Sequence, residues 1–292
     1  MTGKIVKGIA GFYYVDDGDG SVYECKAKGI FRNRKVKPLV GDDVEFSVLD
    51  EEEKEGSIEA IFPRKNELVR PAVANIDQAL VIFSVTHPEP NLNLLDRFLV
   101  MMEVQSVPVN ICFNKTDLSG EEERERLGKI YQTAGYPVYF TSTYENQGID
   151  EVRSLIAGKT TVLAGPSGVG KSSLTNLLYP SAAMETGTIS EKIERGKHTT
   201  RHSELFGIGN GTYMMDTPGF SSMYIENLEC GELKEYFPEF AAFEDECRFL
   251  GCVHIGEPVC GVKEAVKAGE ISESRYDNYR LLYQELKEKR RY

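Results

Sequence analysis

The stretch that decides the fold is Gly165-Pro166-Ser167-Gly168-Val169-Gly170-Lys171-Ser172. It matches G-x-x-x-x-G-K-[ST], the phosphate loop called Walker A. The apolar run 161–164 before it predicts a strand, and leucines at helical spacing after it predict a helix. In that context the glycines let backbone N–H groups turn onto phosphate oxygens. We expect Lys171 to reach the β- and γ-phosphates and the Ser172 hydroxyl to bind Mg²⁺, with Ser173 beside them.

A second motif, Asn114-Lys115-Thr116-Asp117, indicates which base is bound. It follows the apolar run 107–113, so it lies at the end of a predicted strand, the edge where open α/β sheets bind ligands. Asp117 can accept hydrogen bonds from N1–H and the exocyclic amine of guanine. Adenine lacks both groups and would leave a buried carboxylate unpaired. Asn114 can bond to N7 and the stem of Lys115 can lie against the base, so the motif predicts GTP or GDP rather than ATP.

Two further positions are predicted to contact the base. Residues 137–143 are apolar and β-branched and predict a strand. Ser142 and Thr143 at its end stand where GTPases place a backbone contact to guanine O6. This signature is shorter than the other two.

The order of the motifs is unusual. In ordinary GTPases the phosphate loop precedes N-K-x-D, whereas here N-K-x-D comes first. A switch-like stretch at 197–201 and Asp216-Thr217-Pro218-Gly219 follow the loop. In D-x-x-G, Asp216 is expected to position Mg²⁺ and the Gly219 N–H to approach the γ-phosphate. All parts are present in rotated order, which predicts a circularly permuted GTPase, because chain order can rotate where the old ends can be joined.

The switch stretch supplies the candidate catalytic residues. We expect Thr200, or alternatively Thr199, to bind Mg²⁺ and sense the γ-phosphate. Many GTPases orient the attacking water with a glutamine after D-x-x-G, but here that residue is Phe220. His198 is the nearest side chain able to hold or polarise the water. The alternative is that His198 is an exposed loop residue.

Near the end of the chain lies Cys247-x₄-Cys252-x-His254-x₅-Cys260. Three thiols and one imidazole within so few residues suit tetrahedral Zn²⁺, and because no position remains open for water, one structural zinc ion is expected. The alternative is a set of unrelated core cysteines. Residues 276–286 then predict a final helix with a tyrosine stripe, and a basic tail follows.

The N-terminal part, residues 1–68, predicts a different fold. Five short alternating strands, with a strong hairpin signal at 16–20, indicate a small β-barrel of the OB type. Such barrels often bind nucleic acid, and the basic stretch 31–38 is the expected RNA contact. The alternative is a solvated loop that touches nothing. Three domains follow: the barrel at 1–68, an α/β GTPase domain at 69–225, and a mostly helical zinc-binding domain at 226–292.

Composition limits the function classes. The chain has 292 residues, 41% hydrophobic, and a formal net charge of −12, which argues against wholesale nonspecific nucleic-acid binding. No stretch of 18 apolar residues predicts a membrane span, and the N-terminus lacks the apolar segment of a signal peptide. The clustered cysteines fit a reducing cytoplasm. We find no second catalytic constellation that would favour a metabolic enzyme driven by GTP over a nucleotide-dependent binding switch.

Together these motifs resemble the RsgA/YjeQ family of bacterial ribosome small-subunit-dependent GTPases. The resemblance covers essentially the whole chain and rests on the barrel, the rotated motif order, H-T-T-R-H, D-T-P-G-F and the cysteine–histidine spacing. It implies a late-acting assembly factor that binds the 30S subunit and its 16S rRNA through the barrel and zinc domains. It also implies GTP hydrolysis stimulated by the subunit, with His198 in place of glutamine. We further expect a cytoplasmic monomer.

Overall fold

The structure of the chain, a computed structural model, describes residues 1–29, 31, 36–68, 72–179, 204–216, 225 and 228–289. Contacts divide it into two compact units, which are described separately. The first comprises Met1–Leu80, Gly148–Ala164 and Lys171–Pro218, and the second comprises Val81–Gln147, Gly165–Gly170 and Gly219–Tyr292.

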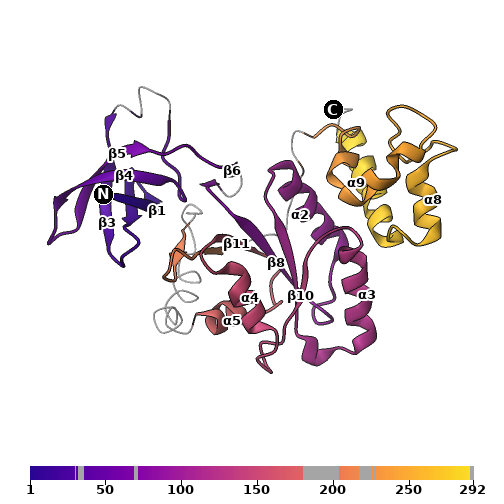
Figure 1. Cartoon of the computed structure of the whole chain (residues 1–292), viewed down its shortest axis with the longest axis horizontal. Coiled ribbons are helices and arrows are strands. Elements are labelled where there is room, and N and C mark those ends of the chain that lie inside the picture. The colour runs from indigo at the N-terminus through magenta and orange to yellow at the C-terminus, as the bar shows by residue number, and fades with distance from the viewer. Residues whose placement is uncertain are drawn as a thin grey trace. The chain divides into compact units, whose positions relative to one another are not determined.

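The N-terminal part of the first unit is a closed barrel (Figure 1). Its strands are β1 (Thr2–Ile9), β2 (Phe12–Asp16), β3 (Val22–Ala27), β4 (Asp43–Asp50) and β5 (Glu55–Ile61), in the order β1-β2-β3-β5-β4. Alternate side chains point inward because strand residues face opposite sides in turn, and Val15, Val44, Phe46 and Ile58 form part of the core. The prediction of a five-stranded barrel is confirmed. Two short strands, β6 (Glu67–Leu68) and β7 (Val73–Ala74), pair beyond it.

A six-stranded sheet forms the α/β part, and β8 contributes residues to both units. Its order is β10-β9-β8-β11-β13-β12. The strands are β8 (Gln78–Ser84), β9 (Val109–Asn114), β10 (Val138–Phe140), β11 (Thr160–Ala164), β12 (Phe206–Gly207) and β13 (Tyr213–Asp216). Every residue of β8, β9 and β11 is buried, as expected for central strands of a largely parallel sheet. Strand β10 runs parallel to β9 and β13 runs parallel to β11, whereas β12 runs antiparallel to β13.

The helices of the α/β part alternate with its strands along the chain. They are α2 (Leu92–Val104), α3 (Glu121–Gln132), α4 (Ile149–Ile156) and α5 (Lys171–Leu178), with a short 3₁₀ turn at Thr116–Leu118. Helix α2 begins at the Asn91 side chain, which accepts a hydrogen bond from the Leu94 N–H, and buries Leu95, Leu99 and Met102 on one face. Among the described residues no helix is long and apolar enough to cross a membrane.

The C-terminal part of the second unit is mostly helical, as predicted. It contains 3₁₀ segments at Leu233–Tyr236 and Pro238–Glu246, then α8 (Gly261–Ala268) and α9 (Glu273–Lys289). The tyrosine stripe of α9 packs inward: Tyr279 lies edge-on to Phe237 and Phe240, with ring centroids 5.1 and 4.9 Å away. Val100 of α2 belongs to the same hydrophobic cluster.

A buried charge cluster also joins α9 to α2. Arg275, which is 0% exposed, donates to both carboxylate oxygens of Glu239 at 2.7 and 3.0 Å and to Asp96 of α2 at 2.8 Å. Asn278 donates to the other oxygen of Asp96 at 2.6 Å, and the guanidinium lies 4.6 Å from the ring centroid of Phe237. One cation therefore satisfies two buried carboxylates.

Replacing Arg275 by methionine should destabilise this part of the chain by about 3–5 kcal/mol, because two carboxylates would stay buried without a counter-charge. Hydrogen exchange of the amides in α2 and α9 would measure the loss. The matched control is Arg280→Met on the same helix, whose ion pair with Asp277 is exposed and should change stability by less than about 1 kcal/mol. Equal protection in the two variants would show that the cluster does not hold α9 to α2.

Candidate functional sites

Asn114, the last residue of β9, joins the guanine motif to the phosphate loop. Its amide Nδ2 donates to the carbonyl of Val169 at 2.9 Å. Its Oδ1 accepts from the Thr141 hydroxyl at 3.1 Å and from the Thr143 N–H at 3.3 Å. The ammonium of Lys115 donates to the carbonyl of Gly168 at 2.6 Å. The two motifs that define the predicted site are therefore held together by side chains of the first and backbone of the second.

Asp117 is half-buried and held in place by Ser142. The Ser142 hydroxyl donates to Asp117 Oδ1 at 2.5 Å and accepts from the Glu145 N–H at 3.0 Å. The sequence prediction gave Ser142 a backbone role at the base. The structure adds a side-chain contact, because the Ser142 hydroxyl orients the carboxylate that the sequence predicts will read the base.

At two positions of the phosphate loop a glycine is required, because neighbouring atoms lie too close to leave room for a side chain. Gly165 has φ +145°, and a Cβ there would lie 2.0 Å from the carbonyl oxygen of Ile82. Gly170 has φ +95°, and a Cβ there would lie 2.3 Å from Nδ2 of Asn114. A side chain at Gly170 would thus displace the amide that joins the two motifs.

The residues predicted to bind the phosphates and Mg²⁺ after the loop lie at the start of α5. Lys171 begins this helix, and Ser172 and Ser173 follow it as exposed residues. Burial lowers the pKa of Lys171, whereas the negative charge of Asp216 acts in the opposite direction. Asp216 ends β13 and lies opposite Leu163 of β11. A serine hydroxyl and a carboxylate are oxygen donors of the kind Mg²⁺ prefers, so these residues fit the predicted magnesium site.

Several predicted residues lie outside the described part of the chain. These are His198, Thr199, Thr200, Thr217, Pro218, Gly219 and residues 32–35 of the basic stretch 31–38.

The four predicted zinc ligands come together. The ligand atoms of Cys247, Cys252, His254 and Cys260 lie within 4.8 Å of one another, and they form the one such cluster among the described residues. Sγ of Cys247 is 3.8 Å from Sγ of Cys260, and Nδ1 of His254 is 3.3 Å from the latter. Tetrahedral Zn²⁺ with Zn–S near 2.3 Å places its sulfur ligands about 3.8 Å apart, so the donor set and its spacing are compatible with zinc.

Residues around the cluster orient its ligands. Nε2 of His254 faces a carboxylate oxygen of Glu244 at 3.2 Å, which leaves Nδ1 toward the thiols. The hydroxyl of Tyr276 donates to the His254 carbonyl at 2.7 Å, and that of Tyr279 donates to the Val253 carbonyl at 2.6 Å. Sequence reasoning placed these tyrosines in a packing stripe and missed their support of the ligand loop.

Thr141 was also missed at the nucleotide site. It is fully buried and orients Asn114, and its place directly before Ser142 was the available signal.

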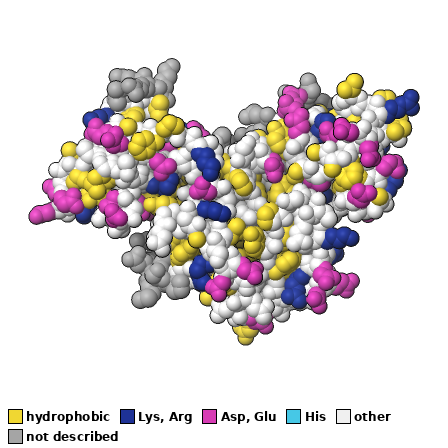
Figure 2. Space-filling model, viewed as in Figure 1, with side chains coloured by type: hydrophobic (Ala, Val, Ile, Leu, Met, Phe, Trp, Pro, Cys, Tyr) yellow, Lys and Arg dark blue, Asp and Glu magenta, His cyan; other side chains and the backbone are white. Residues whose placement is uncertain are grey.

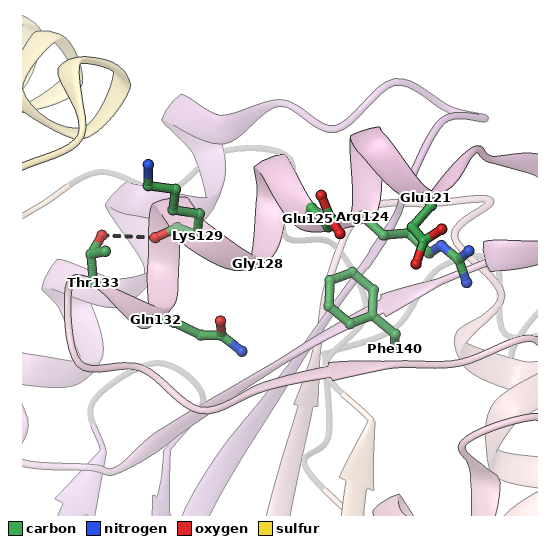
Figure 3. A pocket seen from close by; sticks show the side chains of 8 residues that line it. All are labelled: Glu121, Arg124, Glu125, Gly128, Lys129, Gln132, Thr133 and Phe140. Atoms are coloured by element: carbon green, nitrogen blue, oxygen red, sulfur yellow. Dashed lines mark hydrogen bonds between the residues drawn. The ribbon is translucent and has the colours of Figure 1, made fainter. Parts of the chain in front are cut away.

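A hollow on α3, lined by residues that include Arg124, Lys129 and Phe140, contains none of the residues of the nucleotide motifs (Figure 3). The hollow therefore lies apart from the predicted nucleotide site, whose residues come from loops at the strand ends.

Two side chains of the guanine motif, Asn114 and Lys115, hydrogen-bond to the backbone of the phosphate loop. The two motifs occur in reversed chain order on a largely parallel sheet, and this arrangement defines the class of circularly permuted GTPases.

Comparison with known proteins identifies the family. The model of the RsgA GTPase matches residues 61–226, and that of the RsgA N-terminal domain matches residues 2–58. The chain is 60% identical to the small ribosomal subunit biogenesis GTPase RsgA of Agathobacter rectalis, with both chains fully covered. It is 53% identical to that of Alkaliphilus metalliredigens, with 99% of each covered.

Two solved structures are also similar, each at 38% sequence identity. The crystal structure of YloQ, described as a circularly permuted GTPase, has a TM-score of 0.80 over 99% of this chain and 95% of that one. YjeQ from Thermotoga maritima has a TM-score of 0.81 over 98% of each. The chain belongs to the RsgA family and is a GTP hydrolase, and membership implies that Mg²⁺ accompanies the nucleotide.

Proposed function

We propose that this chain binds the 30S ribosomal subunit, acts late in its maturation, and hydrolyses GTP to GDP and phosphate faster when bound to it. The observation that carries the proposal is the anchored pair of loops, Asn114 to Val169 and Lys115 to Gly168, in a chain whose relatives are named for small-subunit biogenesis. We place this activity in the cytoplasm and assign it to a monomer.

We assign the work to three domains, 1–68, 69–225 and 226–292. The barrel and the zinc-binding domain contact 16S rRNA, and the basic stretch 31–38 supplies positive charge to the barrel's contact. Acidic and basic side chains are mixed over the visible face of the molecule, in keeping with a local contact rather than general attraction to nucleic acid (Figure 2).

The residue roles follow from the motifs and the geometry. Asp117, oriented by Ser142, reads the guanine edge, and Asn114 and Lys115 fix the base between the two loops. The backbone of 165–170 binds the phosphates, and Lys171 neutralises their charge. Ser172, Asp216 and Thr200 (or Thr199) hold Mg²⁺, which when bound offsets the charge that develops on the β- and γ-phosphates.

Hydrolysis needs an oriented water. His198 holds or polarises this water in place of the usual glutamine, and the Gly219 N–H lies near the γ-phosphate. A zinc ion bound by Cys247, Cys252, His254 and Cys260 would be structural, because these four ligands would fill all four tetrahedral positions.

The test is GTP hydrolysis by the purified chain with and without 30S subunits, using His198→Ala and, as the matched control, His202→Ala from the same segment. We expect strong stimulation that His198→Ala lowers about 100-fold and His202→Ala leaves intact. Stimulation that survives His198→Ala would remove His198 from catalysis. If 30S subunits did not stimulate hydrolysis at all, the proposed ribosomal partner would be wrong, and the chain would be a GTPase that acts on another partner.

A further inference from the structure

The hairpin made by residues 204–216 connects the two segments that carry the switch motifs. Its strands β12 and β13 pair antiparallel, and its turn is closed by a hydrogen bond from the Thr212 N–H to the Gly209 carbonyl at 3.0 Å. Strand β13 also pairs in parallel with β11, which leads into the phosphate loop, and it ends at Asp216. Whatever fixes this hairpin therefore also fixes Asp216.

The barrel binds the start of this hairpin through its backbone. The Leu205 N–H donates to the carbonyl of Val6 in β1 at 2.8 Å, and Lys7 and Glu204 form an antiparallel bridge. The pairing of β1 with β2 shifts register between Ile5 and Lys7, which places Val6 at a bulge. Bulges interrupt regular pairing and leave a backbone group for another partner, and here that partner is the hairpin.

Side chains strengthen the same contact. The Lys7 ammonium lies 2.9 Å from a carboxylate oxygen of Glu204, and Leu205 is only 3% exposed. At the other strand, the Lys4 ammonium lies 5.7 Å from the ring centroid of Tyr213. Burial, followed by the negative charges of Asp16 and Asp43, raises the pKa of Tyr213 to about 12. The barrel thus holds both strands of the hairpin.

We propose that the barrel positions Asp216 for Mg²⁺–nucleotide binding by holding hairpin 204–216. The inference rests on the role proposed above for Asp216. Tyr213 is three residues from Asp216 on one short strand, so a shift of the hairpin on the barrel moves the carboxylate with it. Because coupling between sites is reciprocal, a ligand that displaces this contact on the barrel lowers nucleotide affinity, and Mg²⁺–nucleotide in turn favours the docked hairpin.

The test is a charge exchange at the ion pair between Lys7 and Glu204. Lys7→Glu places two carboxylates side by side, and Glu204→Lys places two ammonium groups together. Each should raise the Mg²⁺ concentration for half-maximal binding of a non-hydrolysable GTP analogue about two- to fivefold, the scale of a partly exposed ion pair. The double exchange Lys7→Glu with Glu204→Lys should restore the original value.

Two further variants serve as controls for this test. Lys28→Glu breaks an ion pair with Glu59 of β5, whereas the hairpin contacts described above involve β1, and it should leave the Mg²⁺ dependence unchanged. Asp216→Asn should shift that dependence more than either charge reversal. If Asp216→Asn shifts it and the reversals do not, the barrel has no positioning role and the proposed role of Asp216 stands. If Asp216→Asn causes no shift, both ideas are wrong.

Discussion

Asp117→Asn should lower the affinity of the chain for GTP about 10³-fold and raise its affinity for XTP. The carboxylate accepts from N1–H and the exocyclic amine of guanine, and two bonds to a charged acceptor contribute about 3–6 kcal/mol. Asparagine accepts at one atom and donates at the other. It therefore faces the guanine amine with a second donor, whereas xanthine presents a carbonyl oxygen at that position.

Competition of GTP, XTP and ATP against a fluorescent guanine nucleotide measures this exchange of specificity. Ser142→Ala is a milder variant for comparison. It keeps the Asp117 carboxylate and removes the Ser142 hydroxyl, which lies 2.5 Å from Asp117 Oδ1 and orients it. It should weaken GTP binding about three- to tenfold without admitting XTP, the loss expected for one hydrogen bond. An Asp117→Asn protein that still prefers GTP would place the base elsewhere.

Removing the metal should unfold the region that contains the cysteine–histidine cluster. Structural zinc contributes about 10–16 kcal/mol of binding free energy, as much as or more than the whole stability of an ordinary domain. Cys260 and His254 are both buried, and Cys260 belongs to the hydrophobic cluster that includes residues of α9. Without the metal, these side chains therefore cannot simply turn to solvent. We expect a strong chelator, or Cys260→Ser, to abolish amide protection across 247–260.

Metal analysis and hydrogen exchange on the same samples check this result. One zinc ion per chain should be lost together with protection, and added Zn²⁺ should restore both after chelation. Cys230→Ser is the matched control, because Cys230 is a free cysteine outside the cluster and its replacement should keep the metal. Full protection in metal-free protein would mean that the cluster needs no ion to fold.

Local motifs made the fold and the nucleotide loops predictable. The phosphate loop and N-K-x-D each carry their geometry within a few residues, and a strand before each motif fixes its place at a sheet edge. The bond from Asn114 to Val169 was not predictable in the same way, because it joins residues far apart in the chain. No periodicity encodes such a contact, which depends on the neighbouring backbones in the folded sheet.

The Arg275 cluster escaped prediction for a different reason. A charged residue within a helical pattern is read as surface, because charged side chains are rarely buried unless paired. The partners Asp96 and Glu239 lie in other elements, so their spacing gives no sign of the pairing. The ion pair between Lys7 and Glu204 could not be predicted either, because the two residues lie far apart in the sequence and their spacing gives no sign of the contact.

The strand order has a consequence for synthesis on the ribosome. All seven residues of β8 are buried in the finished sheet, yet β11, its neighbour on one side, begins at residue 160, 76 residues after β8 ends at residue 84. At bacterial elongation rates of about 5–20 residues per second, that edge of the nascent sheet stays open for roughly 4–15 s. A chain with the usual order makes its phosphate-loop strand first. Here a stalled or truncated nascent chain exposes an apolar strand edge of the kind that recruits other chains.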